Sequence, residues 1–208
     1  MGLRPRACNA AGVQPPAVLI LHGLGGSGPD HWTTWLAQTL RVRGARVRYP
    51  QLPSPDTPDP EAWAAALHEE LAGLAEAPAE RVVTCHSLSC TLWMREAGRI
   101  AVSGRPDRVA LVAPPSLAAV PPEAAPLFDP PPDREALAAA AGHTRIVCSE
   151  PDPYCPEGAP DHWARPLGLP FDLLPGSGHI NTDAGYGAWD SMAAWIFDPA
   201  ATLRARPA

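Results

Sequence analysis

Lysine is absent from this 208-residue chain, and its sixteen basic residues are all arginine. The 22 acidic residues outnumber them and leave a formal net charge of −6. A surface with this balance disfavours electrostatic binding to nucleic acid and to anionic membranes. The chain also cannot form a P-loop, because that phosphate-binding motif requires a lysine beside its glycines.

Long apolar runs and paired cysteines are scarce as well. The first apolar run, residues 17–21, is too short for the hydrophobic region of a secretion signal or for a membrane span. The five cysteines are odd in number and form no Cys-x-x-Cys pair, which fits reduced thiols in a cytoplasmic protein. They are residues 8, 85, 90, 148 and 155. Cys155 is expected to be an exposed thiol with no assigned task.

Proline and glycine together make up about a fifth of the residues, less than the roughly 25–30% typical of low-complexity chains. Hydrophobic residues make up 46%, enough for a sizeable core. The length suits one domain over residues 1–208, with its core at about 17–197. Eight prolines lie within residues 114–133, so this segment is expected to be an irregular surface excursion.

Short apolar runs alternate with segments of helical periodicity along the whole chain. The predicted strands are residues 17–21, 46–49, 81–85, 109–112, 145–148 and 171–174. The predicted helices are residues 30–43, 63–74, 88–100, 134–141, 161–167 and 186–197. This alternation predicts an α/β fold, a three-layer α/β/α sandwich with about six mostly parallel strands. In such sheets ligands bind at the carboxyl ends of the strands.

A glycine-rich loop follows the first predicted strand. Residues 23–28, Gly-Leu-Gly-Gly-Ser-Gly, match the dinucleotide-binding pattern, but Arg48 stands where that site needs an acidic residue, so no cofactor is expected. Small residues such as Gly23 instead allow a substrate carbonyl to approach the backbone N–H of Leu24, as in an oxyanion hole. Ser27, Pro29 and Asp30 are expected to begin the next helix.

The third predicted strand ends in Cys85-His86-Ser87-Leu88-Ser89-Cys90. A serine on a tight strand-to-helix turn exposes its Oγ, and the N–H of Leu88 would then stabilise an oxyanion. The usual nucleophile elbow has glycine where Cys85 and Ser89 stand, so Ser87 as a helix N-cap remains an alternative. A metal site on Cys85, His86 and Cys90 lacks the usual zinc spacing, and no metal is expected. His86 itself is expected to be structural and turned away from the site.

Two further residues follow predicted strands in the order that α/β-hydrolases use for their serine, acid and histidine. Asp152 follows the fifth strand and His179 follows the sixth. Asp172 fits worse because it lies within a strand, and Asp183 because it lies beyond the histidine. Glu150 is the close rival to Asp152.

Several motifs together resemble a known family. They are His22-Gly23, Asp30-His31-Trp32, His86-Ser87-Leu88, Asp152-Pro153-Tyr154, and Gly178-His179-Ile180-Asn181 with Gly185, Gly187 and Trp189. With them the sequence resembles the small serine α/β-hydrolases related to retinoblastoma-binding protein 9, especially the bacterial YdeN-like members, over residues 17–197. The resemblance implies a minimal α/β-hydrolase with Ser87, Asp152 and His179 as its triad. No room remains for a separate lid domain.

The expected function is hydrolysis of a small acyl ester through an acyl-enzyme at Ser87. Gly23, His31, Trp32 and Tyr154 are candidates to line the pocket, and residues 114–133 are expected to cover part of its mouth. An amidase, peptidase, thioesterase or lactonase with the same triad remains an alternative.

A protein-binding module on this fold is the other alternative. Residues 146–150, Ile-Val-Cys-Ser-Glu, nearly match the L-x-C-x-E segment through which the family's vertebrate member binds a pocket protein. They lie on a predicted buried strand, so no obligate protein partner is expected.

Overall fold

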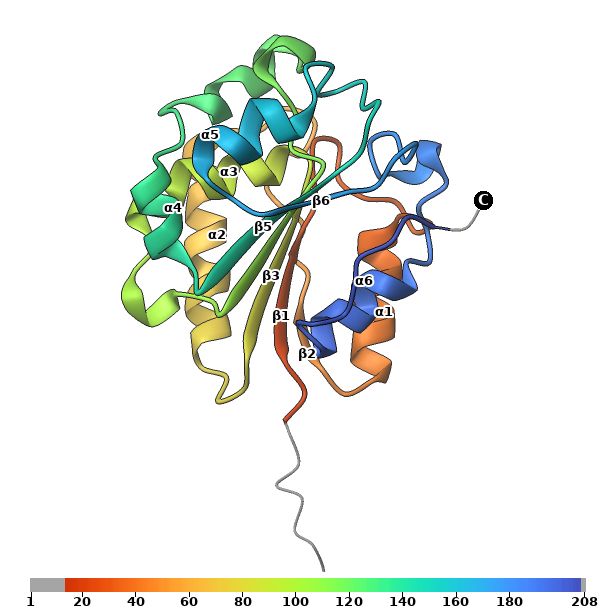
Figure 1. Cartoon of the computed structure of the whole chain (residues 1–208). Helices are drawn as coiled ribbons and strands as arrows, with labels where there is room; N and C mark the ends of the chain where they lie inside the picture. Colours follow the sequence, from red (N-terminus) through yellow and green to blue (C-terminus); the bar gives the residue numbers. More distant parts are fainter. Residues whose placement is uncertain (1–13, 207–208) are drawn as a thin grey trace, which may run out of the picture.

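The computed structural model describes residues 14–206, and a six-stranded, fully parallel sheet runs through its centre (Figure 1). The strands are β1 (Ala17–Leu21), β2 (Arg46–Arg48), β3 (Arg81–His86), β4 (Arg108–Val112), β5 (His143–Cys148) and β6 (Phe171–Leu173). Their order is β2-β1-β3-β4-β5-β6, and each neighbouring pair is parallel. The predicted α/β class is confirmed, and each predicted strand is present to within about two residues.

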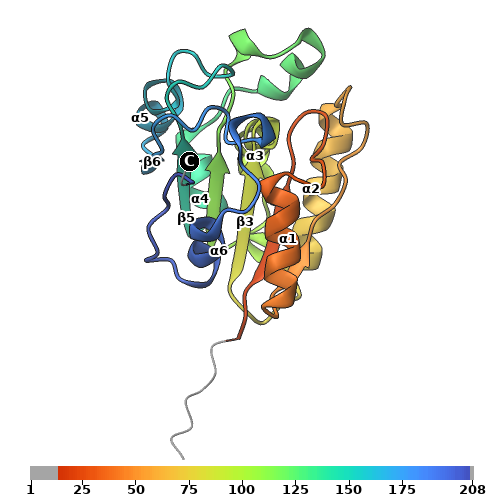
Figure 2. The same ribbon diagram turned by 90° about the vertical axis from the view of Figure 1, so that its right-hand side faces the viewer.

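Helices cover both faces of this sheet, as the alternation predicts. α1 (Trp32–Val42) and α6 (Asp190–Phe197) pack on one face, which is turned toward the viewer in Figure 2. The other face is covered by α2 (Pro60–Ala75), α3 (Leu88–Glu96), α4 (Arg134–Ala140) and α5 (Arg165–Leu167). Because both faces of the sheet are covered, every residue of β1 and β4 is buried, and neither strand alternates between buried and exposed positions.

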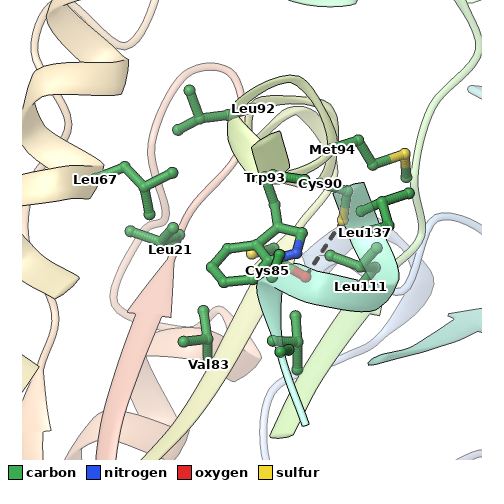
Figure 3. Packing of buried hydrophobic residues seen from close by; sticks show 14 of the residues in the cluster. Leu21, Leu67, Val83, Cys85, Cys90, Leu92, Trp93, Met94, Leu111 and Leu137 are labelled. Carbon is green, nitrogen blue, oxygen red and sulfur yellow. Dashed lines mark hydrogen bonds between the residues drawn. The ribbon is translucent and has the colours of Figure 1, made fainter. Parts of the chain in front are cut away.

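The core beneath α3 is densely filled with aromatic, aliphatic and sulfur side chains (Figure 3). Trp93 lies against Cys85 of β3, with Leu111 of β4 beside it, and all three side chains are fully buried. The Cys90 thiol donates to the backbone oxygen of Cys85 across 3.5 Å. Cys85, two residues before Ser87, is therefore a core residue. A glycine at this position would leave a cavity beneath Trp93.

The prediction of an exposed thiol at Cys155 is wrong. Its side chain is 1% exposed and belongs to the same core, and burial raises the pKa of this thiol to about 12. The chain turns back after Asp152, whose carbonyl accepts from the Cys155 N–H at 3.1 Å, and the turn carries the side chain inward. The four described cysteines are unpaired and buried, and Cys8 lies outside the described residues.

Two predicted helix starts and one segment predicted to be irregular need correction. α1 is capped by His31, whose Nδ1 accepts from the Thr33 N–H at 3.2 Å, so residues 27–30 precede the cap instead of supplying it. α6 begins at Asp190 and not at Tyr186. The proline-rich segment 114–133 contains two short 3-10 helices, Leu117–Ala119 and Pro122–Phe128. Pro122 is tolerated at the start of the second helix because the first residues of a helix need no N–H donor, whereas Pro126 lies inside it.

The segment that nearly matches L-x-C-x-E lies mostly within β5, between β4 and β6. Ile146 and Cys148 are 0% and 1% exposed. A partner could reach the side chains of Ile146 and Cys148 only if the strand left the sheet, whereas Glu150 is exposed. Within residues 14–206, no helix combines the length and the apolar character that crossing a bilayer requires.

Candidate active site

Ser87 occupies the turn between β3 and α3 in a strained conformation, with φ 55° and ψ −123°. A non-glycine residue adopts positive φ at a cost of about 1–3 kcal/mol, so the surrounding structure must hold it there. Its N–H donates to the Val112 carbonyl at 2.9 Å, and its own carbonyl accepts from the Cys90 N–H at 2.8 Å. The Oγ makes no capping bond to α3, so the N-cap alternative is wrong.

The structure brings Ser87, His179 and Asp152 together from three separate strand ends. Ser87 Oγ lies 2.8 Å from His179 Nε2, and His179 Nδ1 lies 3.0 and 2.9 Å from the two carboxylate oxygens of Asp152. Because Asp152 accepts at Nδ1, the neutral imidazole carries its proton there and leaves Nε2 free to accept from the serine hydroxyl. The three side chains form one continuous hydrogen-bonded chain.

The rival carboxylates do not contact the imidazole, although Asp183 lines the cavity beside Ser87. Glu150 is exposed and its side chain lies against Gly158. Asp172 pairs with Arg145 at 3.1 Å. Asp152 is 4% exposed, and its Oδ1 also accepts from the Tyr154 N–H at 2.8 Å, which fixes the carboxylate relative to His179. Of the candidate acids, Asp152 alone contacts the imidazole.

Gly23 passes so close to Ser87 that no other residue fits without movement. A Cβ on Gly23 would lie 2.8 Å from the Ser87 Cβ and 3.1 Å from the His86 carbonyl. The next residue, Leu24, and Leu88 at the start of α3 both line the cavity beside Ser87. Neither of their N–H groups donates to an acceptor among residues 14–206, so both are available to a bound oxyanion.

His22 orients this loop, a role that the sequence analysis missed. Its Nδ1 donates to the Gly23 carbonyl at 2.8 Å, and its Nε2 accepts from the Leu52 N–H at 2.8 Å. The Gly23 carbonyl and the Leu24 N–H share one trans peptide group and point in opposite directions. Holding the carbonyl against His22 therefore turns the Leu24 N–H the other way. The position of His22 directly before Gly23 was the available signal.

Ser89 replaces the second glycine of the usual elbow without disturbing it. Its Oγ accepts from the His86 N–H at 2.9 Å and lies 3.1 Å from the Leu21 carbonyl and 2.9 Å from that of His86. The hydroxyl thus links the ends of β1 and β3. An apolar side chain at this position would leave the buried His86 N–H without an acceptor.

Similarity to known proteins agrees with this geometry. The serine hydrolase family matches residues 18–197, which is most of the chain. The chain belongs to the serine hydrolase family. No curated protein sequence matches it.

Solved structures of low sequence identity share the fold of this serine hydrolase family member. The YdeN gene product of Bacillus subtilis is 22% identical with a TM-score of 0.74, covering 87% of this chain and 96% of its own. A YdeN-like hydrolase from Pectobacterium atrosepticum is 19% identical with a TM-score of 0.71, covering 89% and 90%. An esterase domain from a Rhodothermus marinus protein is 16% identical with a TM-score of 0.58, covering 86% and 85%. The YdeN-like resemblance is confirmed.

A cavity of about 260 Å³ opens beside Ser87 in this family member. Gly23, His31 and Tyr154 line it as predicted, and Pro115 and Val120 bring the proline-rich segment over its mouth. The Tyr154 ring lies 4.3 Å from that of His179, measured between centroids. Four further lining residues were not predicted for the cavity, although Ser27 and Asn181 belong to motifs quoted above: Ser27, Asn181, Thr182 and Asp183.

Trp32 does not line the cavity, so that prediction is wrong. It is fully buried and packs edge-on against Trp189 at 5.2 Å, between the sheet and α6. The first residue of α1 faces the core, whereas the capping residue His31 lies one position earlier and faces the cavity.

The prediction that His86 turns away from the site is wrong. Its ring lies 5.3 Å from that of His179 and 4.8 Å from that of His31, and it lines the cavity. Its Nε2 donates to the backbone carbonyl of His179 at 3.1 Å, which holds the histidine loop in place. Burial sets the pKa of His86 well below its usual value, so the ring is neutral. In the described part of the chain, no three His, Cys, Asp or Glu side chains converge as metal ligands do.

The buried histidines predict that this family member loses stability in mild acid. Burial lowers the pKa of His22 and His86, and it lowers that of His31 to about 4. In the unfolded chain these histidines bind protons near pH 6.5. Below that pH unfolding therefore takes up protons, and the free energy of unfolding falls. For His31 alone the free energy of unfolding should fall by about 2 kcal/mol between pH 7 and pH 5.

Urea unfolding at the two pH values measures this loss. His31→Asn, which removes one of the titrating groups, should lose less stability over the same interval. An equal loss in the variant and the wild type would contradict the assignment of His31 as a buried neutral group.

Proposed function

We propose that this protein is an esterase that cleaves small acyl esters through a covalent acyl-enzyme at Ser87. The observation that carries the proposal is the continuous hydrogen-bonded chain from Ser87 Oγ through His179 to Asp152, with distances of 2.8 and 2.9 Å, beside a cavity. A serine hydroxyl becomes a useful nucleophile only when an adjacent base accepts its proton, and this arrangement supplies that base.

In the first half of the reaction, Ser87 Oγ attacks the ester carbonyl while His179 Nε2 takes the hydroxyl proton. Asp152, hydrogen-bonded at Nδ1, stabilises the imidazolium that forms. The N–H groups of Leu24 and Leu88 donate to the tetrahedral oxyanion, each contributing about 3 kcal/mol by comparison with other hydrolases. The imidazolium then gives its proton to the leaving alkoxide, which departs as the alcohol, and Ser87 keeps the acyl group.

In the second half, water takes the place of the alcohol. His179 Nε2 accepts a proton from the water as its oxygen attacks the acyl carbon, and the same two N–H groups hold the oxyanion. Collapse of this intermediate returns the proton to Ser87 Oγ and releases the carboxylic acid. No oxidant, metal ion or cofactor enters this balance.

The size of the cavity supports a small acyl group. Its volume of about 260 Å³ lies just below the range of roughly 300–1,000 Å³ that drug-sized ligands occupy. A long acyl chain would have to extend past Tyr154 and the proline-rich segment into water. The esterase domain named among the similar folds supports the same reaction class, acyl transfer from an ester to water.

A fluorophosphonate probe together with a substrate panel tests the proposal. The probe should add one adduct, located on Ser87 by peptide mass spectrometry. Among p-nitrophenyl esters, kcat/KM should be highest for acetyl to butyryl groups and fall toward dodecanoyl. Parallel thioesters and aminoacyl amides distinguish the thioesterase and amidase alternatives. An adduct at another residue, or amide cleavage without ester cleavage, would contradict the proposed function.

A further inference from the structure

We propose that His31 is a specificity-determining residue whose Nε2–H donates a hydrogen bond to an oxygen atom of the substrate. The site then prefers esters that carry a hydroxyl, ether or keto oxygen near the scissile bond over esters with plain alkyl groups. The inference rests on the proposed function, since it names the substrate class of the same site. It is carried by the geometry around His31, which the proposed triad chemistry leaves without a role.

The helix cap determines which nitrogen of His31 carries the proton. Nδ1 accepts from the Thr33 N–H at 3.2 Å and lies 2.9 Å from the Thr33 hydroxyl. A nitrogen that accepts from a backbone N–H has no proton of its own in the neutral ring. The proton of neutral His31 is therefore on Nε2, which makes that nitrogen a donor only.

The ring stays neutral at physiological pH. Burial, together with the charges that His179 and His22 carry when protonated, lowers the pKa of His31 to about 4. His31 therefore presents a neutral N–H and not a cation. Such a group suits an uncharged oxygen better than a phosphate or sulfonate, for which a cationic side chain would be expected.

This Nε2–H has no acceptor within the protein. Through the described range 14–206, no hydrogen bond joins His31 Nε2 to another residue, although the residue is only 6% exposed. The ring lines the cavity next to His86, and Nδ1 is already engaged at the helix end. The Nε2 atom itself is not sealed from solvent, so a ligand or water in the cavity provides its acceptor.

Ser27 adds a second unpartnered polar atom to the same wall. Its Oγ is buried and makes no hydrogen bond to the part of the chain that the structure describes, and the residue lines the same cavity. The other lining residues of the loop are Gly23, Leu24, Gly26 and Gly28, which have no polar side chain. Among the lining residues between positions 23 and 31, His31 and Ser27 therefore have the only polar side chains, and Ser27 Oγ is enclosed by the protein.

The neutral His31 N–H defines a substrate class on its side of the cavity, which Asn181, Thr182 and Asp183 line as well. A hydroxyl, ether or keto oxygen on the bound group would satisfy the His31 N–H, whereas a methylene at the same position would leave it unpaired. Sites built to bind an oxygen atom discriminate strongly against analogues that lack it, because the protein donor loses its partner. The oxygen can belong to the acyl group or to the alcohol, and matched substrates distinguish the two sources.

The experiment compares esters that differ by one exchange of CH₂ for O. For the acyl side the pair is p-nitrophenyl butyrate and p-nitrophenyl methoxyacetate, and for the alcohol side butyl acetate and 2-methoxyethyl acetate. The readout is the oxygenated-to-alkyl ratio of kcat/KM in each variant divided by the same ratio in the wild type. Intrinsic differences in ester reactivity cancel in this quotient.

Two substitutions separate the cap from the donor. His31→Asn places an amide oxygen near the position of Nδ1, keeping the cap, and removes the donor; asparagine is among the best N-cap residues. His31→Gln places an amide N–H near the position of Nε2 and loses the cap. For one of the two pairs, His31→Asn should lower the ratio about five- to tenfold, and His31→Gln should restore most of it. His143→Asn, at an exposed position in β5, is the matched control and should leave the ratio unchanged.

A binding measurement keeps the result independent of turnover. In Ser87→Ala, the ¹⁵N spectrum of histidine-labelled protein should show His31 protonated at Nε2, and 2-methoxyethyl acetate or methyl methoxyacetate should shift that signal more than its alkyl counterpart. A proton on Nδ1, equal shifts from both members of each pair, or an unchanged ratio in His31→Asn would overturn the inference. Absence of Ser87-dependent hydrolysis of every ester would instead overturn the proposed function.

Discussion

Ser87→Ala should lower kcat/KM for short aryl esters by about 10⁴-fold or more, to the level of the uncatalysed reaction plus what the remaining site provides. The substitution removes the only atom that can form the acyl-enzyme, since no other hydroxyl or thiol lies within hydrogen-bond distance of His179 Nε2 among residues 14–206. In this variant His179 could still act as a base, but residue 87 would offer it no hydroxyl to deprotonate.

The fold should tolerate this change. Alanine keeps the Cβ that packs against Gly23, and the backbone bonds to Val112 and Cys90 do not involve the side chain. The free energy of unfolding should therefore change by no more than about 1 kcal/mol, the net contribution of one hydrogen bond. Ser103→Ala is the control, because this serine is exposed and does not line the cavity, and it should keep full activity. If Ser87→Ala folded and still turned over at more than one per cent of wild type, roughly two of the four expected decades, the proposed nucleophile would be wrong.

Asp152→Asn should lower kcat/KM by about 10⁴-fold, a loss typical of removing the charge from such a triad. The bond from the Tyr154 N–H to Oδ1, at 2.8 Å, gives the reason. An asparagine has one acceptor oxygen, and that oxygen would stay on the Tyr154 N–H. Its NH₂ group would then face His179 Nδ1 and donate to it, which forces the imidazole proton onto Nε2. In that tautomer His179 cannot accept the proton of Ser87.

Glu150→Gln is the matched control for this variant. It makes the same chemical change two residues away, on an exposed side chain that does not contact the imidazole. Its kcat/KM should stay within about threefold of wild type, as for surface substitutions away from the site. The measurement is steady-state hydrolysis of one short ester by both variants. A large loss in Glu150→Gln with little loss in Asp152→Asn would reverse the assignment of the acid.

The strand pattern and the triad order could be predicted because both depend on local or sequential properties. Continuous apolar runs such as Ala17–Leu21 predict buried parallel strands, and strand ends of a parallel sheet meet at one edge. Ser87 directly follows β3, and Asp152 and His179 lie in the loops after β5 and β6, so topology placed all three at the same edge of the sheet. The choice between Asp152 and Glu150 could not be made this way, because both lie in the same loop and only its folded path decides which one faces His179.

The helix cap and the pocket wall were decided by tertiary packing. Sequence preference favoured Ser27 or Asp30 as the start of α1, yet His31 caps the helix and Trp32 enters the core against Trp189. Similarly, Ser89 departs from the elbow pattern in the sequence. The structure explains the serine, because the carbonyls of Leu21 and His86 accept from its hydroxyl. These contacts join residues from different strands and helices, so no local preference encodes them.

The amino-acid sequence by itself determined the fold class, the number of strands and the candidate serine and histidine of the triad, and it limited the acid to Asp152 or Glu150. Hydrophobic periodicity and residue order depend on chain neighbours and on the few topologies that a parallel sheet allows. Tertiary structure alone decided which side chains line the cavity, which nitrogen of His22, His31 and His179 carries its proton, and how His22 holds the peptide group between Gly23 and Leu24. Those properties depend on distances of a few ångströms between residues far apart in sequence, where one hydrogen bond fixes the orientation of a group.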